Sequence, residues 1–431
     1  MNSEWQVKSL GDLADIHQKQ VNPAHSPAQV FRHFSLPAYD IGQAPIKEPG
    51  SAIGSQKFSV PAGSVLVSKL NPRITRVWYP KVTDDFPAIA STEFLVLRPK
   101  QDVDGRFLKY VCLSPSVLSE MKSRATGTSG SHQRVRPEDA LKIEVDVPVC
   151  IEEQQAISRV LGSLDDRIDN NRALAANLEA IARRLFKSWF VDFDPVRAKA
   201  AGEKPLGLAD DIAALFPDRF EDSELGEIPE GWQQTTLAAT ASLNPETWTT
   251  RKHPNEIDYL DLSNVKDGVI EAPTKYSWDD APSRARRVLQ QGDTIIGTVR
   301  PGNRSFALID EVGFTGSTGF AVLRPLSNVN REFLYIAATN DDAIERLAHL
   351  ADGAAYPAVR PEVVLATEII IPSDEVMTAF SAVTKGMVDR ASVCKQESNV
   401  LAEIRDLLLP RLISGKLRVG DAESTIEEAI A

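Results

Sequence analysis

Residues 152–190 read EEQQAISRVLGSLDDRIDNNRALAANLEAIARRLFKSWF, and this stretch decides how the rest of the chain is interpreted. It contains no proline and a single glycine, and its apolar residues recur at alternating spacings of four and three. This spacing is typical of the a and d positions of a coiled coil, so it predicts one long helix with an apolar seam. One seam position is a polar Asn, where a buried amide can fix the register of a helix pair. The seam positions are Ile157, Leu161, Leu164, Ile168, Asn171, Ala175, Leu178, Ala182, Leu185 and Trp189.

A second, less regular seam lies near the C-terminus, where Thr384, Ser398 and Arg405 interrupt the apolar positions. We expect the two helices to pack as an antiparallel coiled coil, and at 1.5 Å per residue the first would span roughly 55 Å and act as a spacer. The alternative, one surface helix on each domain, fits the seam less well. The apolar positions of the second seam are Phe380, Met387, Ala391, Cys394, Leu401, Leu408 and Leu412.

The regions that precede the two helices are copies of each other. Residues 91–99 read STEFLVLRP and residues 317–325 read STGFAVLRP, which is a shift of 226 positions. Trp5 and Trp232 begin the two copies, and an Arg-Pro-Glu triplet recurs after a shift of 224. A shift that drifts so little across half the chain indicates a duplicated domain.

Each copy contains short β-rich runs, such as residues 64–68 and 293–297, separated by Pro and Gly punctuation. The chain is therefore predicted to be α+β, with two repeated mixed α/β domains that are β-rich, have long loops and are separated by the two helices. The predicted segments are a first domain (1–150), a first spacer helix (151–190), a linker (191–231), a second domain (232–372), a second spacer helix (373–417) and a C-terminal tail (418–431).

Composition narrows the class of protein. The formal charge of -12 argues against strong independent binding to nucleic acid, although local basic clusters exist. Cys112, Cys150 and Cys394 form no CxxC pair, and no apolar run is long enough for a membrane helix. The N-terminus lacks the pattern of a signal peptide. We expect a soluble, cytoplasmic protein without a membrane partner.

Basic and polar residues gather in loops at comparable points of the two copies. Residues 69–73 follow a strand in the first copy and residues 298–302 follow one in the second, and a Gly-rich loop follows later in each. Arg, Gln and Tyr in such loops suit contacts to phosphates and base edges, since Arg pairs with guanine and Gln with adenine. Solvated loops with ordinary surface arginines are the alternative, and Arg136 and Arg360 precede proline and could be structural. The candidate DNA-binding residues are Lys69, Arg73, Arg76, Gln133, Arg134, Arg136, Arg286, Arg300, Arg304, Tyr356 and Arg360.

The sequence predicts no catalytic or metal site. Gly415-Lys416 lacks the rest of a P-loop, and the glycine-rich residues 313–319 precede a strand instead of opening a helix. Asp192-Phe193-Asp194-Pro195 has only one of the two prolines of the amino-methyltransferase motif, and the six histidines show no metal-ligand spacing. We therefore predict a chain that is not itself an enzyme.

Four strings resemble those of a known family, the specificity (S) subunits of type I restriction-modification systems. Residues 152–171 and 185–196 resemble the two ends of the family's first conserved helix, with EEQQAI and LFKSWFVDFDPV. Residues 222–232, DSELGEIPEGW, resemble the entry to the second recognition domain, and residues 408–417, LLPRLISGKL, resemble the C-terminal close. The second helix departs from the pattern at residues 374–377, where DEVM replaces the usual Glu-Gln-Gln start.

The resemblance implies two target recognition domains that each read one half of a bipartite double-stranded DNA site. It also implies two docked methyltransferase subunits on the outward faces of the helices, and motor-nuclease subunits that join for cleavage. The chain would bind no cofactor, since S-adenosylmethionine, ATP and Mg²⁺ would belong to the partners. The alternatives are a specificity subunit of a related type II-like or other phage-defence methyltransferase and, less favoured, a stand-alone DNA methyltransferase.

Overall fold

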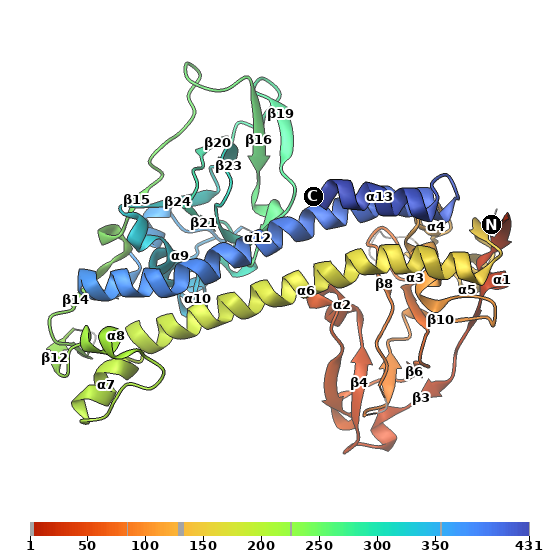
Figure 1. The fold of residues 1–431 in the computed structure, drawn as a ribbon, viewed down its shortest axis with the longest axis horizontal. Coiled ribbons are helices and arrows are strands. Elements are labelled where there is room, and N and C mark those ends of the chain that lie inside the picture. Colours follow the sequence, from red (N-terminus) through yellow and green to blue (C-terminus); the bar gives the residue numbers. More distant parts are fainter. Residues whose placement is uncertain (1–3, 84, 128–132, 225, 354–355, 431) are drawn as a thin grey trace. The chain divides into compact units, whose positions relative to one another are not determined.

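The computed structural model describes residues 4–83, 85–127, 133–224, 226–353 and 356–430. The chain forms two compact units, which we call unit 1 (residues 1–169 and 400–431) and unit 2 (residues 170–399). Two 40-residue helices, α6 (Ile151–Phe190) and α12 (Asp374–Ile413), each contribute residues to both units. The predicted helix at 152–190 is confirmed, and the α+β class is confirmed by strands and helices in each unit (Figure 1).

The described residues of unit 1 form three sheets. The strands of one sheet, in spatial order, are β2 (Ala14–Ile16), β10 (Phe94–Pro99), β7 (Val65–Ser68) and β8 (Val77–Trp78). The second sheet is β3 (Gln20–Val21), β6 (Lys57–Ser59), β9 (Ala88–Ala90), β4 (Val30–Phe34) and β5 (Ile46–Pro49), and the third pairs β1 (Trp5–Ser9) with β11 (Glu144–Pro148). The shorter helices are α1 (Leu10–Leu13), α2 (Leu36–Gly42), α3 (Gly105–Leu113), α4 (Pro115–Ser123), α5 (Pro137–Ala140) and α13 (Val419–Ile430).

Unit 2 repeats this plan. The strands of one sheet, in spatial order, are β15 (Ala241–Leu243), β24 (Phe320–Pro325), β21 (Thr294–Gly297) and β22 (Phe306–Leu308). The strands of the second are β19 (Thr274–Ser277), β16 (Glu256–Leu260), β23 (Phe314–Ser317) and β20 (Ala285–Val288). A third sheet pairs β14 (Gln233–Thr236) with β25 (Glu368–Ile371). Two hairpins add β12 (Phe220–Ser223) with β13 (Gly226–Pro229) and β17 (Val265–Lys266) with β18 (Val269–Ile270). The shorter helices are α7 (Asp194–Ala200), α8 (Asp210–Ala214), α9 (Arg331–Thr339), α10 (Asp341–Leu350) and α11 (Pro361–Leu365).

The sheet topology confirms the duplication. The order β2-β10-β7-β8 in unit 1 corresponds strand by strand to β15-β24-β21-β22 in unit 2, and β1-β11 corresponds to β14-β25. Each unit also has one parallel strand pair, β4 with β9 and β16 with β23. The parallel pairs were not visible in the sequence pattern because their strands are three to five residues long.

The seam of each long helix is part of the core of the unit in which it lies. In unit 1, seam residues of both helices are buried in one cluster with α3 and the strands. In unit 2 the rings of Phe186 and Trp189 on α6 lie 6.3 and 5.7 Å from the ring of Phe380 on α12. Glu179 and Lys395 form an ion pair of 2.6 Å farther along the same two segments, which run antiparallel. The buried seam residues of unit 1 are Ile157, Leu161, Leu164, Ile168, Leu401, Leu408 and Leu412. Leu178 and Leu185 pack, partly buried, against clusters of unit 2.

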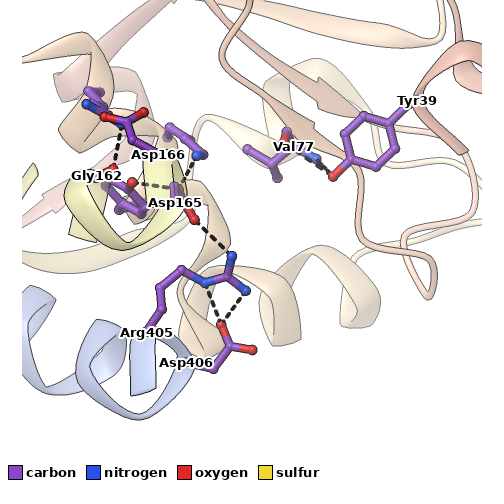
Figure 2. A network of polar contacts seen from close by, with 10 residues as sticks. Tyr39, Val77, Gly162, Asp165, Asp166, Arg405 and Asp406 are labelled. Carbon is purple, nitrogen blue, oxygen red and sulfur yellow. Dashed lines mark hydrogen bonds and ion pairs between the residues drawn. The ribbon is translucent and has the colours of Figure 1, made fainter. Parts of the chain in front are cut away.

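A cluster of charged residues around Asp165, which we call the charged hub, joins α6 and α12 to α3 in unit 1 (Figure 2). The carboxylate of Asp165 on α6 accepts hydrogen bonds from Lys109 Nζ at 2.5 Å, Tyr110 Oη at 2.7 Å and Arg405 Nη1 at 2.9 Å. Arg405, which interrupts the predicted seam, is therefore accommodated by an acid on the facing helix. Burial acts to raise the pKa of Asp165, but the Lys109 charge and the three hydrogen bonds outweigh it and lower the pKa below its ordinary 3.8.

We predict that Asp165→Asn lowers the free energy of unfolding by about 2 kcal/mol at pH 7, because it removes the counter-charge of the partly buried Lys109 and leaves Arg405 with only the exposed Asp406. Since the folded pKa is depressed, the carboxylate stabilises the fold above pH 3.8, and this contribution is lost as the pH falls through the folded pKa. The gap between wild type and variant, measured as urea unfolding midpoints, should therefore narrow below about pH 4. Asp166→Asn, which removes a half-exposed partner of Arg106, is the matched control and should cost less than about 1 kcal/mol. Equal losses for the two variants would contradict the role of the hub.

Candidate nucleic-acid interface

In each unit the structure joins the two loops that the sequence had singled out. In unit 1, Lys69 follows β7, and its carbonyl accepts a hydrogen bond from the Val135 N–H at 3.0 Å, while the Asn71 N–H donates to the Gln133 carbonyl at 2.8 Å. In unit 2, the Thr298 carbonyl accepts from the Val359 N–H at 2.9 Å, and the Arg300 N–H donates to the Pro357 carbonyl at 2.7 Å. We call each assembly a paired loop: residues 69–76 with 133–136 in unit 1, and residues 298–304 with 356–360 in unit 2. Residues 128–132 and 354–355 of the glycine-rich loops lie outside the described residues.

Both paired loops turn at a residue in the left-handed region of backbone conformation. Asn71 has φ 46° and Arg300 has φ 48°, and each stands directly before a proline. A side chain other than glycine in this region costs of order 1 kcal/mol and is held there by surrounding structure. The matching geometry shows that the duplication extends from the sheets into the loops.

The predicted residues of unit 1 fall into two groups. Arg73 and Arg136 are exposed, and Lys69 and Gln133 are half-buried in the same paired loop. Two other predicted arginines form hydrogen bonds with carboxylates of the same unit. Arg76 donates two to Asp40, at 2.6 and 2.7 Å. Arg134 donates two to Glu93, both at 3.0 Å. The hydrogen bonds to Asp40 raise the pKa of Arg76, so this guanidinium is a fixed positive charge.

The predicted residues of unit 2 include an exposed aromatic ring. The Arg300 guanidinium lies 4.7 Å from the ring centroid of Tyr356, whose side chain is 70% exposed. Arg304 forms ion pairs with Asp267 and Asp341, so part of its charge is already compensated. Arg360 is exposed at the start of α11, as Arg136 is at the start of α5.

A stacked trio in unit 2 was only partly anticipated from the sequence. The rings of His253 and Trp278 stack at 4.1 Å with an interplanar angle of 8°, and the Arg286 guanidinium lies 4.4 Å from the centroid of Trp278. Arg286 was selected from the sequence, whereas His253 and Trp278 were not, although the basic run Arg251-Lys252 beside His253 was a usable signal. Stacked aromatic and guanidinium groups suit contacts to bases and sugars.

The described residues offer no group of three or more His, Cys, Asp or Glu side chains arranged to hold a metal ion. None of the helices in this part of the chain is both long enough and apolar enough to cross a membrane.

Comparisons with known proteins agree on one family. Residues 2–180 match the type I restriction modification DNA specificity domain. The specificity subunit of the type I restriction enzyme HindI from Haemophilus influenzae is 24% identical over 468 residues, covering 96% of this chain and 100% of the relative. The MjaIX specificity subunit from Methanocaldococcus jannaschii is 22% identical and covers 96% of this chain and 94% of the relative.

A solved structure supports the fold. The crystal structure of the S subunit of a type I restriction-modification system from M. genitalium aligns with a TM-score of 0.58, 16% identity and 96% coverage of each chain. Because the alignments with these two relatives cover 96% of this chain, they extend over both copies of the duplicated fold. Residues 2–180 therefore match the type I DNA specificity domain, and 96% of the chain aligns with specificity subunits of type I restriction enzymes.

Proposed function

We propose that the chain reads a bipartite double-stranded DNA target, with one recognition domain on each half-site. The observation that carries this proposal is the paired loop, which occurs twice with the same backbone hydrogen bonds and the same left-handed turn. Two paired loops with the same backbone but different side chains suit a target with two different halves. The two long helices would fix the spacing between the halves, as dimer geometry fixes half-site spacing in other DNA readers.

The candidate arginines would make different kinds of contact with DNA. Arg73, Arg136 and Arg360 are exposed and suited to phosphate contacts. Arg300 with Tyr356, and Arg286 with Trp278, form rigid stacked pairs that present a guanidinium edge for a base. Arg76, Arg134 and Arg304 already bind carboxylates, so each would have to exchange or share its partner to contact DNA. Lys69 and Gln133 would complete the surface of the first domain.

We further propose that two methyltransferase subunits dock on the outward faces of α6 and α12. These faces carry exposed apolar side chains at seven-residue intervals, which place them on one side of a helix. In unit 2 they are Leu174 and Ile181 on α6, and in unit 1 they are Val400 and Leu407 on α12. Exposed apolar residues in a repeating row are typical of a surface that a partner covers.

The chemistry would belong to the partners. The methyltransferase subunits would bind S-adenosylmethionine and methylate adenine, and motor-nuclease subunits would supply ATP- and Mg²⁺-dependent cleavage. The net charge of -12 fits this division, because a chain with more acidic than basic residues binds DNA weakly until partners add phosphate contacts. This role would place the chain in the cytoplasm with the DNA.

A map of modified bases in the host genome, with and without the gene for this chain, tests the proposed function. We expect methylated adenines in a two-part motif with an unread gap, and we expect them to disappear when the gene is deleted. Restoring the gene on a plasmid is the control. Retention of every methylated motif in the deletion strain would contradict the proposal.

The division of the target between the units can be tested with Arg300→Ala. We expect this variant to relax the sequence requirement of one half-site only, with a loss of about 1–3 kcal/mol in discrimination at one base pair. The assay is competition binding by the assembled methyltransferase against targets changed at single positions. Arg73→Ala should affect the other half-site, or weaken all sequences alike if it contacts a phosphate. Arg219→Ala, at a largely exposed site outside the paired loops, is the matched control. Relaxation of both half-sites by Arg300→Ala would contradict one domain per half-site.

A further inference from the structure

Each unit contains a cavity beside the end of a long helix. The cavity of unit 2 has a volume of about 570 Å³ and lies where α6 ends, between α10 and β25. The cavity of unit 1 has a volume of about 360 Å³ and lies where α12 ends, between α4 and β11. None of the residues that line the two cavities belongs to a paired loop, and the proposed DNA contacts use neither cavity.

Corresponding residues of the two copies line parts of both cavities. Residues 144–146 of β11 line the first, and the corresponding residues 368–370 of β25 line the second. The start of α4 lines the first cavity with Ser114 and Ser116, and the corresponding start of α10 lines the second with Asn340 and Asp342. The duplicated fold therefore has a cavity at the corresponding place in each copy.

The ends of the long helices complete the correspondence. Ile413 and Ser414, at the close of α12, line the cavity of unit 1, whereas Phe190 and Val191, at the close of α6, line that of unit 2. A tryptophan from the start of each domain covers each helix end. The indole N–H of Trp5 donates to the Ile413 carbonyl at 2.7 Å, and the ring of Trp232 lies 5.9 Å from that of Phe190.

Both cavities combine an apolar floor with an acidic rim. The floor in unit 2 is aromatic, with Phe186, Phe190 and Phe333, and the floor in unit 1 contains Val145 and Ile413. A glutamate occupies the same exposed position at each rim, Glu144 in unit 1 and Glu368 in unit 2. The remaining charged lining residues are Glu227, Asp342 and Arg346 in unit 2, and Asp146 and Lys416 in unit 1, so acids outnumber bases in each.

We propose that these cavities are two equivalent anchor sites for one segment of the methyltransferase subunit, with one copy of the subunit in each. The segment would insert an apolar side chain into the floor and place Lys or Arg against the acidic rim. Two equivalent sites on one chain suit two copies of one partner, and this is why a partner is favoured over a second copy of this chain. The inference rests on the proposed docking of two methyltransferase subunits and assigns each of them a specific site.

Charge reversal at the rim tests the anchor sites. Glu144→Lys and Glu368→Lys change exposed strand residues, so the fold should survive, which urea unfolding can verify. With the purified methyltransferase subunit as the probe, we expect wild type to bind two copies by native mass spectrometry. Each single variant should bind one copy as tightly as wild type and the other about tenfold more weakly or worse, and the double variant should bind both weakly. Asp102→Lys and Glu311→Lys, at exposed acids outside the cavities, are the matched controls.

The outcomes separate the two levels of the proposal. Unchanged affinity in both single variants would overturn the anchor sites while leaving methyltransferase docking intact. Absence of binding by wild type would instead overturn the docking on which they rest.

Photo-crosslinking identifies the occupant directly. The photoreactive residue p-benzoylphenylalanine can replace Val7 or Val191, which line the two cavities and are 63% and 49% exposed. We expect both positions to crosslink to the same methyltransferase peptide, one that contains an apolar residue next to Lys or Arg. Crosslinks to different peptides, or to a second copy of this chain, would overturn the proposal.

Discussion

The apolar seam of the two long helices is the constraint on which the rest of the structure depends. In unit 1 the same side chains that face the second helix are also buried against the recognition domain, so one row of residues serves two interfaces. Each fully buried Leu or Ile contributes roughly 1.5–3 kcal/mol. A shift of either helix along its axis would therefore disturb the core of a domain as well as the helix pair. The position of each domain on its helix segments is thereby fixed.

Polar residues within the seam also restrict the register of the two helices, by different means in the two units. Unit 1 uses a charged pair, Asp165 with Arg405, whose two partners come from facing helices. Unit 2 places Asn171 in the seam, buried, and its Nδ2 has no hydrogen-bond acceptor within the described part of the chain. The hydroxyl groups of Ser398 and Thr384 donate hydrogen bonds to carbonyls of their own helix, so burying them in the seam costs little stability. Such polar positions lower stability somewhat but penalise wrong registers, which an all-apolar seam would tolerate.

Regular features were predictable from the sequence, whereas long-range pairings were not. The helix at 152–190, the duplication and strands such as β7 and β21 followed from periodicity and from the repeat. The ion pairs of Arg76 with Asp40 and of Arg134 with Glu93 join residues 36 and 41 positions apart, and no local pattern marks them. The same holds for the stack of His253 on Trp278. Ile413, at the end of α12, is buried in the core of unit 1, and Phe190, at the end of α6, is buried in the core of unit 2. These contacts also depend on tertiary packing, which periodicity does not report.

Main-chain hydrogen bonds join the two segments of each paired loop, and this has a consequence for recognition. The bonds between Lys69 and Val135, and between Thr298 and Val359, use only backbone N–H and C=O groups. A side chain can therefore change without removing the bonds that hold the loop in place. The two units illustrate this, because Asn71 and Arg300 occupy the same turn with the same backbone geometry but different side chains. A scaffold whose loop is fixed by backbone and whose surface is set by side chains can present different half-sites on one fold. The duplication has produced two such surfaces within a single chain.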